Sequence, residues 1–390
     1  MNMVQRPNST ASLSDIFLSF LRLGATAFGG PAIVPHIRTM IVDRKGWVDG
    51  HTFDSGNALA QVVPGAISVQ VAAFVGLQVR GLAGAAAASA GYILPAFLFM
   101  LGLSALYERW HDTAGVAAGF SGMRAVVIAI LGHAALVSAR TYLKNRTAIC
   151  IAGIAALLFG LHANPVPVIL GSGIAGWLAL AAAGCPQEAT GVQQKQSWLR
   201  QALVLLCAVA AGFGLLYLVD KQLFPLALLM FKIDLFAFGG GYTSVPLMFH
   251  EIVEVRAWLS SPTLLDGIAL GQFTPGPIVI TATFIGYLLR GVTGAAAATA
   301  CIFLPSFLIV VLLSPCIDRL RRRKGFNGFM QGILCSFAGL LFSTVLHFSR
   351  HMDWTLGHVL LASGSFAALY ARIPIIIVVL GGIAAALLLL

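Results

Sequence analysis

Two glycine-rich segments, about 210 residues apart, carry residue types that could bind a small ligand. The first reads Phe28-Gly29-Gly30-Pro31 and the second reads Phe238-Gly239-Gly240. Adjacent glycines weaken a helix and proline lacks a backbone donor, so each segment should interrupt a helix and free backbone amides. Such amides can bind an anion at the end of a broken helix. Close packing of helices through small residues is the alternative role, but the repetition of the break favours a binding site.

A second pair of interruptions follows in both copies. The first is Gln61-Val62-Val63-Pro64-Gly65 and the second is Gln272-Phe273-Thr274-Pro275-Gly276-Pro277. A Pro-Gly run stops one helix and can start the next, whose positive N-terminal end would then point into the membrane interior. The glutamines and the threonine add side-chain hydrogen-bonding groups, although a simple helix kink is the alternative. The first copy has Ala66 where the second has Pro277, so the two half-sites need not be equivalent.

Charged residues occur beside the first break of each copy. Arg22 and Lys232 stand at equivalent places, six residues before the Phe-Gly-Gly runs. A cation inside a membrane span is energetically costly, which favours a role in an anion pathway; a side chain reaching the headgroups is the alternative. Asp234 has Gly24 as its counterpart, and a plain ion pair with Lys232 is favoured over a role in proton coupling. The predicted substrate-binding residues are Arg22, Phe28, Gly29, Gly30, Pro31, Gln61, Pro64, Gly65, Lys232, Asp234, Phe238, Gly239, Gly240, Gln272, Thr274, Pro275, Gly276 and Pro277.

The composition indicates the elements that must position these residues. Of 390 residues, 58% are hydrophobic and 10% are charged, and the mean hydropathy is +0.90. Apolar runs of spanning length recur along the whole chain, so we expect an all-α polytopic membrane protein, and a soluble protein is excluded. About thirteen segments are predicted, at 15–36, 55–79, 82–106, 117–139, 147–163, 166–184, 202–219, 226–249, 265–289, 293–315, 328–348, 355–371 and 373–390. Some of them are short enough to be broken or re-entrant half-helices.

The duplication predicts how the chain is divided. We expect an N-terminal repeat at 1–184, a linker with one extra membrane segment at 185–225, and a C-terminal repeat at 226–390. Six segments plus one make seven, so the second repeat would begin from the opposite side and the repeats would be inverted. With the N-terminus in the cytoplasm, fourteen loop Lys and Arg lie inside and seven outside, which agrees with the positive-inside rule. In this assignment Arg256 is inside and Arg350 outside, while Arg38, Arg44 and Lys45 lie outside against the trend.

The remaining residues offer little chemistry of other kinds. The six cysteines and nine histidines are scattered without metal-ligand spacing, so no metal or cofactor is expected. No phosphate-binding loop or nucleophile motif occurs, which argues against an enzyme or an ATP-driven pump. The net charge of +10 comes with no basic helix or aromatic-and-basic array, so nucleic acid is not expected as a partner. The excess fits cytoplasmic loops and is also compatible with an anion pathway.

The duplicated Phe-Gly-Gly segments and the run Leu270-Gly271-Gln272-Phe273-Thr274-Pro275-Gly276-Pro277 resemble the chromate ion transporter family, in its two-domain, long-chain form. The resemblance covers nearly the whole chain; only Val63-Pro64-Gly65-Ala66 departs from an expected Pro-Gly-Pro. It implies secondary transport of chromate, usually efflux through the bacterial inner membrane that gives chromate resistance. Sulfate, another tetrahedral oxyanion, is a plausible competitor, and uptake or exchange of such anions is the alternative. A channel, or a membrane-embedded enzyme acting on a lipid or quinone, is less favoured.

The expected partners follow from this interpretation. They are a chromate or sulfate anion, a coupling proton and the lipid bilayer. A homodimer is left open, because nothing in the sequence decides the oligomeric state.

Overall fold

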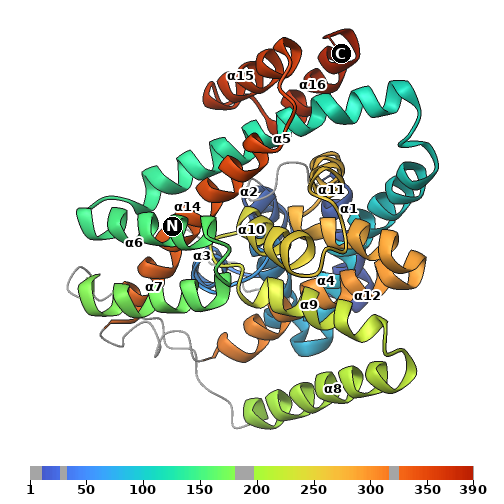
Figure 1. Cartoon of the computed structure of the whole chain (residues 1–390). Coiled ribbons are helices and arrows are strands. Elements are labelled where there is room, and N and C mark those ends of the chain that lie inside the picture. The colour runs from blue at the N-terminus through green and yellow to red at the C-terminus, as the bar shows by residue number, and fades with distance from the viewer. Residues whose placement is uncertain (1–10, 27–32, 181–196, 316–324, 390) are drawn as a thin grey trace. The chain divides into compact units, whose positions relative to one another are not determined.

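Helices make up the architecture of this chain (Figure 1). The computed structural model describes residues 11–26, 33–180, 197–315 and 325–389. In chain order, the elements are α1 (Leu13–Thr26), α2 (Val34–Arg38), η2 (Thr39–Arg44), α3 (Gly50–Val62), α4 (Ile67–Trp110), α5 (Ala114–Tyr142), α6 (Arg146–Gly160), α7 (Pro165–Leu180), α8 (Ser197–Val219), α9 (Leu223–Leu235), η4 (Gly241–Thr243), α10 (Ser244–Met248), η5 (Phe249–Val255), α11 (Ser261–Phe273), η6 (Ile278–Ile280), α12 (Thr281–Leu313), α14 (Phe326–Arg350), α15 (Leu356–Tyr370) and α16 (Ile375–Leu389). No strand occurs in these ranges.

The long apolar helices confirm the prediction of a polytopic membrane protein. Within the described residues, five are long and apolar enough to cross a bilayer, and they include the extra segment predicted at 202–219. They are Ile67–Trp110, Gly115–Tyr142, Ala202–Val219, Ile278–Leu313 and Phe326–Arg350. Four further apolar helices are shorter.

Both copies break their helices at the predicted Pro-Gly runs. In the first, α3 ends at Val62 and α4 begins at Ile67. In the second, α11 ends at Phe273 and helical structure resumes at Ile278. The glycine of each run takes a positive φ, +122° at Gly65 and +116° at Gly276, a conformation that a side chain disfavours. The breaks are therefore built into the backbone in the same way twice.

The chain also reverses direction at the Arg-Gly pair of each copy. Arg80 and Gly81 interrupt α4, and Arg290 and Gly291 interrupt α12 with nearly the same dihedral angles. A Cβ placed on Gly76 would lie 2.2 Å from the backbone oxygen of Gly84. Residues eight apart on a continuous helix would be about 12 Å apart along its axis, so each of these elements consists of two helices folded against each other.

A third feature repeats in the segment that precedes the Pro-Gly break of each copy. The amide of Trp47 donates to the Ile41 oxygen at 3.0 Å, and the amide of Trp258 donates to the Ile252 oxygen at 2.8 Å. A cation covers each indole ring, from Lys45 in the first copy and from Arg256 in the second. Local geometry thus follows the duplication in the sequence.

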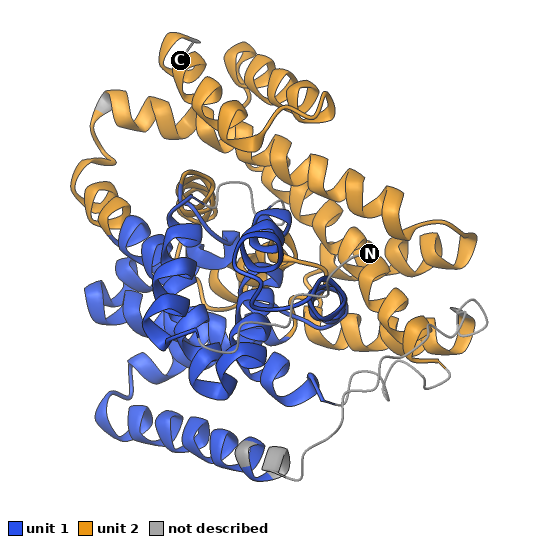
Figure 2. Cartoon of the chain, turned by 180° about the vertical axis from the view of Figure 1, so that it is seen from behind, with its two compact units in different colours: residues 1–101, 189–235, 274–318 blue, residues 102–188, 236–273, 319–390 orange. Residues whose placement is uncertain are grey.

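The described helices form two compact units that cut across the repeats (Figure 2). Unit 1 comprises residues 1–101, 189–235 and 274–318, and unit 2 comprises residues 102–188, 236–273 and 319–390. In unit 1, α9 packs along α12. In unit 2, α14 packs against α5, α6 and α7, while α15 and α16 pack against α5. Each unit therefore draws helices from both repeats, and the predicted inversion axis and domain boundaries stay predictions.

Unit 2 corrects the predicted sidedness of one connection. Glu254, just before Arg256, accepts a hydrogen bond at 2.7 Å from His162 in the α6–α7 connection, and Glu254 and Arg350 line one cavity. The η5–α11 connection therefore lies at the same end of unit 2 as the α6–α7 and α14–α15 connections. The assignment of Arg256 and Arg350 to opposite faces does not hold. The predicted segment 226–249 is not one continuous helix, because it is broken between α9 and η4.

Candidate functional site

Asp234 is the buried acid around which the site in unit 1 is built. It lies one residue before the end of α9 and its exposed fraction is 0%. Its Oδ2 accepts two hydrogen bonds from Ser306, at 3.0 Å from the amide and 2.7 Å from the hydroxyl. Its Oδ1 accepts none from the residues that the structure describes. A buried acceptor without a partner is costly, and the C-terminal end of a helix also disfavours negative charge.

Ser306 connects this acid to the Pro-Gly break of the other repeat. The amide of Ala66, directly after Gly65, donates to the Ser306 hydroxyl oxygen at 2.7 Å. The hydroxyl proton goes in turn to Asp234. A backbone amide freed by the first-copy break is therefore linked through one side chain to a carboxylate of the second copy.

The contacts that join Gly65 and Ala66 to Ser306 and Asp234 form a junction between the two copies. This junction requires a glycine at position 65. A Cβ at Gly65 would lie 2.3 Å from the Ser306 hydroxyl oxygen and 2.7 Å from Nε2 of Gln70. That Nε2 donates to the Pro64 carbonyl oxygen at 2.5 Å, which satisfies an acceptor exposed by the break. The other amide atom of Gln70, Oε1, is buried and accepts no hydrogen bond from the described part of the chain. The junction thus combines a special backbone conformation with two buried oxygen atoms that lack partners, a combination typical of functional sites.

The first copy builds the same junction without polar side chains. Gly24 stands at the place of Asp234, and a Cβ there would lie 2.3 Å from the backbone oxygen of Tyr92. A Cβ on Gly276 would lie 3.0 Å from the Cβ of Ala96, the counterpart of Ser306. Each Pro-Gly break therefore faces the residue after a helix-interior proline of the other copy. Among the described residues, only the junction at Gly65 has an acid and a serine hydroxyl from the other copy. The sequence suggested unequal half-sites from Ala66 and Pro277, and the structure adds Asp234 and Ser306 to that difference.

The second Phe-Gly-Gly break lies in unit 2. Gly240 is buried, and its carbonyl oxygen accepts hydrogen bonds from the amide and hydroxyl of Thr243. Tyr242 donates to Oε1 of Gln272 at 3.4 Å, whereas the buried Nε2 of Gln272 has no acceptor among the described residues. An unused amide donor beside a helix break suits an anion.

The other predicted residues are placed as follows. Phe28, Gly29, Gly30 and Pro31 lie outside the described residues. Thr274, Pro275, Gly276 and Pro277 are buried in the break between α11 and η6, Phe238 is half-buried and Gly239 is exposed.

The two glutamines and the two cations are not equivalent between the copies. Gln61 is exposed where Gln272 is buried, and Arg22 is exposed where Lys232 is half-buried. None of the hydrogen bonds of Asp234 comes from Lys232; they come from Ser306. The favoured ion pair is therefore not the interaction that holds this carboxylate. Residues two apart point to different sides of a helix, which is the physical reason.

Sequence reasoning missed Ser306 and Gln70, and in unit 2 a buried ion pair. Arg124 on α5 donates to both oxygens of Asp266 on α11, at 2.7 and 2.8 Å, and Tyr107 donates to Oδ2 at 2.9 Å. Both oxygens of Asp266 are thus satisfied, whereas Asp234 has only Oδ2 satisfied by the described residues, which marks the Asp266 pair as a structural contact. The sequence does hold one signal that could have found Ser306. Pro305 is followed by this serine, whereas the matching proline of the first copy, Pro95, is followed by Ala96.

The arrangement in unit 1 can bind and release a proton but offers little for a metal. Within the described ranges, no group of three or more His, Cys, Asp and Glu side chains is placed to hold a metal ion. The features are those of a polytopic membrane protein of duplicated, broken helices whose breaks meet buried polar groups, the class that secondary transporters represent.

The chain belongs to the chromate transporter family. The sequence model of that family matches residues 14–177 and again 224–387, one match for each copy. The match accounts for most of the chain and confirms the two repeats.

Relatives support this assignment over nearly the full length. An uncharacterized transporter of Methanocaldococcus jannaschii is 39% identical over 97% of this chain and 94% of its own. A chromate transport protein of Cupriavidus metallidurans is 30% identical, covering 95% of this chain and 93% of its own, and one of Pseudomonas aeruginosa is 30% identical, covering 95% and 90%. No solved structure matches.

Proposed function

We propose that this chain is a secondary active transporter of chromate that moves the anion out of the cytoplasm and thereby confers chromate resistance. Family membership and the two relatives named chromate transport proteins support the substrate. Chromate and sulfate are tetrahedral oxyanions, so sulfate should compete. Such anions suit backbone amides, helix ends and one or two cations, and they need no metal or covalent chemistry.

The broken helices would form the anion site. The amides freed at the Phe-Gly-Gly and Pro-Gly breaks would donate to the oxyanion, and Arg22 and Lys232 would supply counter-charge. Gln272 supports this role because its buried Nε2 has no acceptor. The Pro-Gly breaks occur in both repeats with matching backbone geometry, which is the arrangement expected for alternating access around one site.

Asp234 would couple transport to protons. The observation that carries this proposal is its buried Oδ1, which accepts no hydrogen bond while Oδ2 is held by Ser306. A proton on Oδ1 would remove an uncompensated buried charge. Because Ser306 also holds the amide of Ala66, a change in the charge of Asp234 is felt at the first-copy break. Proton binding and the shape of the break are thus linked through one hydroxyl.

The test is chromate flux in inside-out vesicles, with and without an imposed proton gradient, and with sulfate as competitor. We expect gradient-dependent accumulation that sulfate reduces. Failure of chromate to move under every condition removes the substrate proposal, and movement of sulfate alone would favour the alternative anion.

Coupling is tested separately with Asp234→Asn. This variant should lose the response to the gradient while keeping exchange of chromate across the membrane. The matched control is Asp220→Asn, because Asp220 caps the opposite end of α9 through the amides of Gln222 and Leu223, and asparagine caps equally well. A normal gradient response in Asp234→Asn contradicts the coupling role.

A further inference from the structure

A cavity of about 250 Å³ lies at the end of unit 2 where α6, η5 and α14 finish. Its lining includes His162, Glu254, Ser343, His347, Arg350 and His351. Four of these six side chains are basic. The residues come from three separate segments of the chain, so the cavity is made by the tertiary fold.

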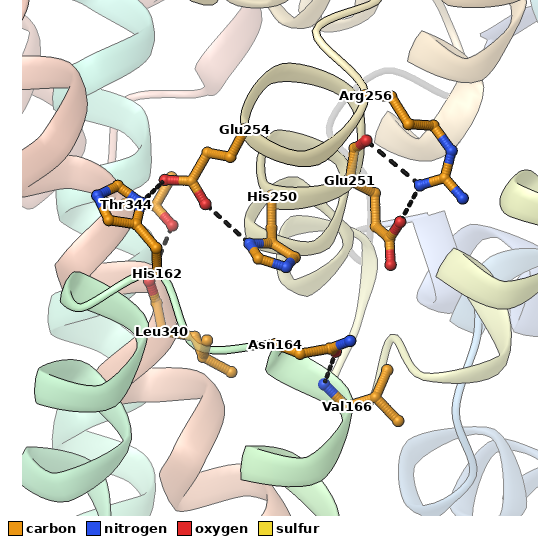
Figure 3. A network of polar contacts seen from close by, with 9 residues as sticks. All are labelled: His162, Asn164, Val166, His250, Glu251, Glu254, Arg256, Leu340 and Thr344. Carbon is orange, nitrogen blue, oxygen red and sulfur yellow. Dashed lines mark hydrogen bonds and ion pairs between the residues drawn. The ribbon is translucent and has the colours of Figure 1, made fainter.

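The one acid of this lining, Glu254, is ionised, and both of its oxygens are held by hydrogen bonds (Figure 3). Oε1 of Glu254 accepts from Nδ1 of His162 at 2.7 Å, and Oε2 accepts from Nδ1 of His250 at 2.8 Å. An ionised carboxylate only accepts hydrogen bonds, so both imidazoles carry a proton on Nδ1. Burial alone would raise the pKa of Glu254, but the hydrogen bonds from His250 and His162 outweigh it and hold the pKa below its usual value. Glu254 is therefore not available to a cation.

The basic groups have spare donor capacity. Arg350 makes no ion pair with any of the described residues, although its guanidinium carries five donors. His351 stacks on His347 with ring centroids 4.1 Å apart, an arrangement that keeps two imidazoles together at the cavity wall. Ser343, one helical turn before His347 on α14, adds a hydroxyl group to the cavity wall. The Arg350 guanidinium, the imidazoles and the Ser343 hydroxyl thus bring hydrogen-bond donors and one fixed cation to a space large enough for a small ion and its waters.

We propose that this cavity is a binding site for a tetrahedral oxyanion group, held by Arg350 and the surrounding histidines. None of its lining residues belongs to a helix break, and the site does not depend on the transport proposal. Because it lies at helix ends, where a membrane surface would be, the same chemistry could come from a free ion or from the phosphate of a lipid headgroup. A merely structural role, in which Arg350 and His347 complement the C-terminal dipole of α14, needs no ligand.

Histidine modification by diethyl pyrocarbonate, read by mass spectrometry, tests the site locally. The full chain is placed in nanodiscs of neutral lipid, and sulfate is the probe because it stays dianionic across the working pH range. Sulfate should slow modification of His162 and His351 but not of His36 and His51, which are exposed on unit 1. Equal protection of all four histidines, or of none, overturns the free-ion form of the site.

Variants identify the group that holds the anion. Arg350→Gln should weaken protection by sulfate roughly tenfold or more, the size expected for losing a charge-assisted hydrogen bond. Arg350→Lys should retain part of it. The matched control is Arg140→Gln, since Arg140 lies near the end of α5 and bonds Tyr370 instead. Unchanged protection in Arg350→Gln contradicts the proposal.

Neutral and anionic nanodiscs distinguish the two sources. Protection that appears only with phosphatidylglycerol, without added sulfate, assigns the site to a lipid headgroup. Protection by neither sulfate nor anionic lipid overturns the proposal in both forms.

Discussion

Gly65→Ala tests whether the junction between the first-copy break and Asp234 is needed for transport. The new methyl group would meet the Ser306 hydroxyl oxygen at 2.3 Å and Nε2 of Gln70 at 2.7 Å, at a backbone φ of +122°. The backbone conformation costs about 1–3 kcal/mol for a residue other than glycine. Displacing Ser306 adds the loss of its hydrogen bonds to an amide and a carboxylate, so the total is about 3–7 kcal/mol.

Gly81→Ala is the matched control. Gly81 also has a positive φ, +63°, but a Cβ there would have nothing within 4 Å. It should therefore cost only the backbone part, about 1–3 kcal/mol. The remaining difference of about 2–4 kcal/mol should appear as lower stability of Gly65→Ala than of Gly81→Ala, and chromate flux per inserted protein should also be lower in Gly65→Ala.

The assay is initial chromate flux in vesicles, normalised to the amount of inserted protein, with thermal unfolding of the purified variants beside it. The double variant Gly65→Ala, Ser306→Ala removes the atom that the methyl group meets, so its stability loss should be smaller than the two single losses combined. Equal flux for Gly65→Ala and Gly81→Ala, or strictly additive losses in the double variant, would refute the reasoning.

Three other predictions concern charge and topology. Replacing Arg22 or Lys232 with Gln should abolish chromate flux while the protein still inserts, because a buried dianion needs counter-charge; unimpaired flux in the double variant would show that backbone amides suffice. The lowered pKa of Glu254 means that its ionised form stabilises the fold above the usual carboxyl value of 4.5. That contribution is lost as pH falls through the lower folded value, so the melting temperature of Glu254→Gln should lie below wild type at neutral pH and approach it in acid. If the repeats are inverted, Lys45 should face the side opposite to Arg256, so single cysteines at the two positions should react with impermeant reagents from opposite faces; labelling from the same face would exclude inversion.

Inversion of the repeats would also account for the loop cations that oppose the positive-inside rule. If Arg256 lies with Arg350 on the outer face, an inverted first repeat puts Arg38, Arg44 and Lys45 in the cytoplasm. These three cations were the ones that opposed the positive-inside rule. Their placement would then follow the rule.

Much of the fold could be predicted because its signals are local. The helix breaks at Pro64-Gly65 and Pro275-Gly276 appear where predicted, since glycine and proline act through their own backbone preferences. The extra segment at 202–219 is a helix, because hydropathy over a span needs no tertiary information. The assignment of Arg256 and Arg350 to opposite faces was wrong for the opposite reason: it depends on tertiary contacts, which bring His162, Glu254 and Arg350 together at one end of unit 2.

Sequence alone thus determined that the chain spans a membrane many times, that it is duplicated, and that each copy is broken at matched Gly and Pro residues. These properties depend on composition, hydropathy and backbone chemistry, which every short segment carries by itself. Only the tertiary structure decided that Asp234 is held by Ser306 and not by Lys232, and that Ala66 joins them. Those contacts connect residues 72 and 240 positions apart, and no local preference encodes which side chains meet when distant helices pack.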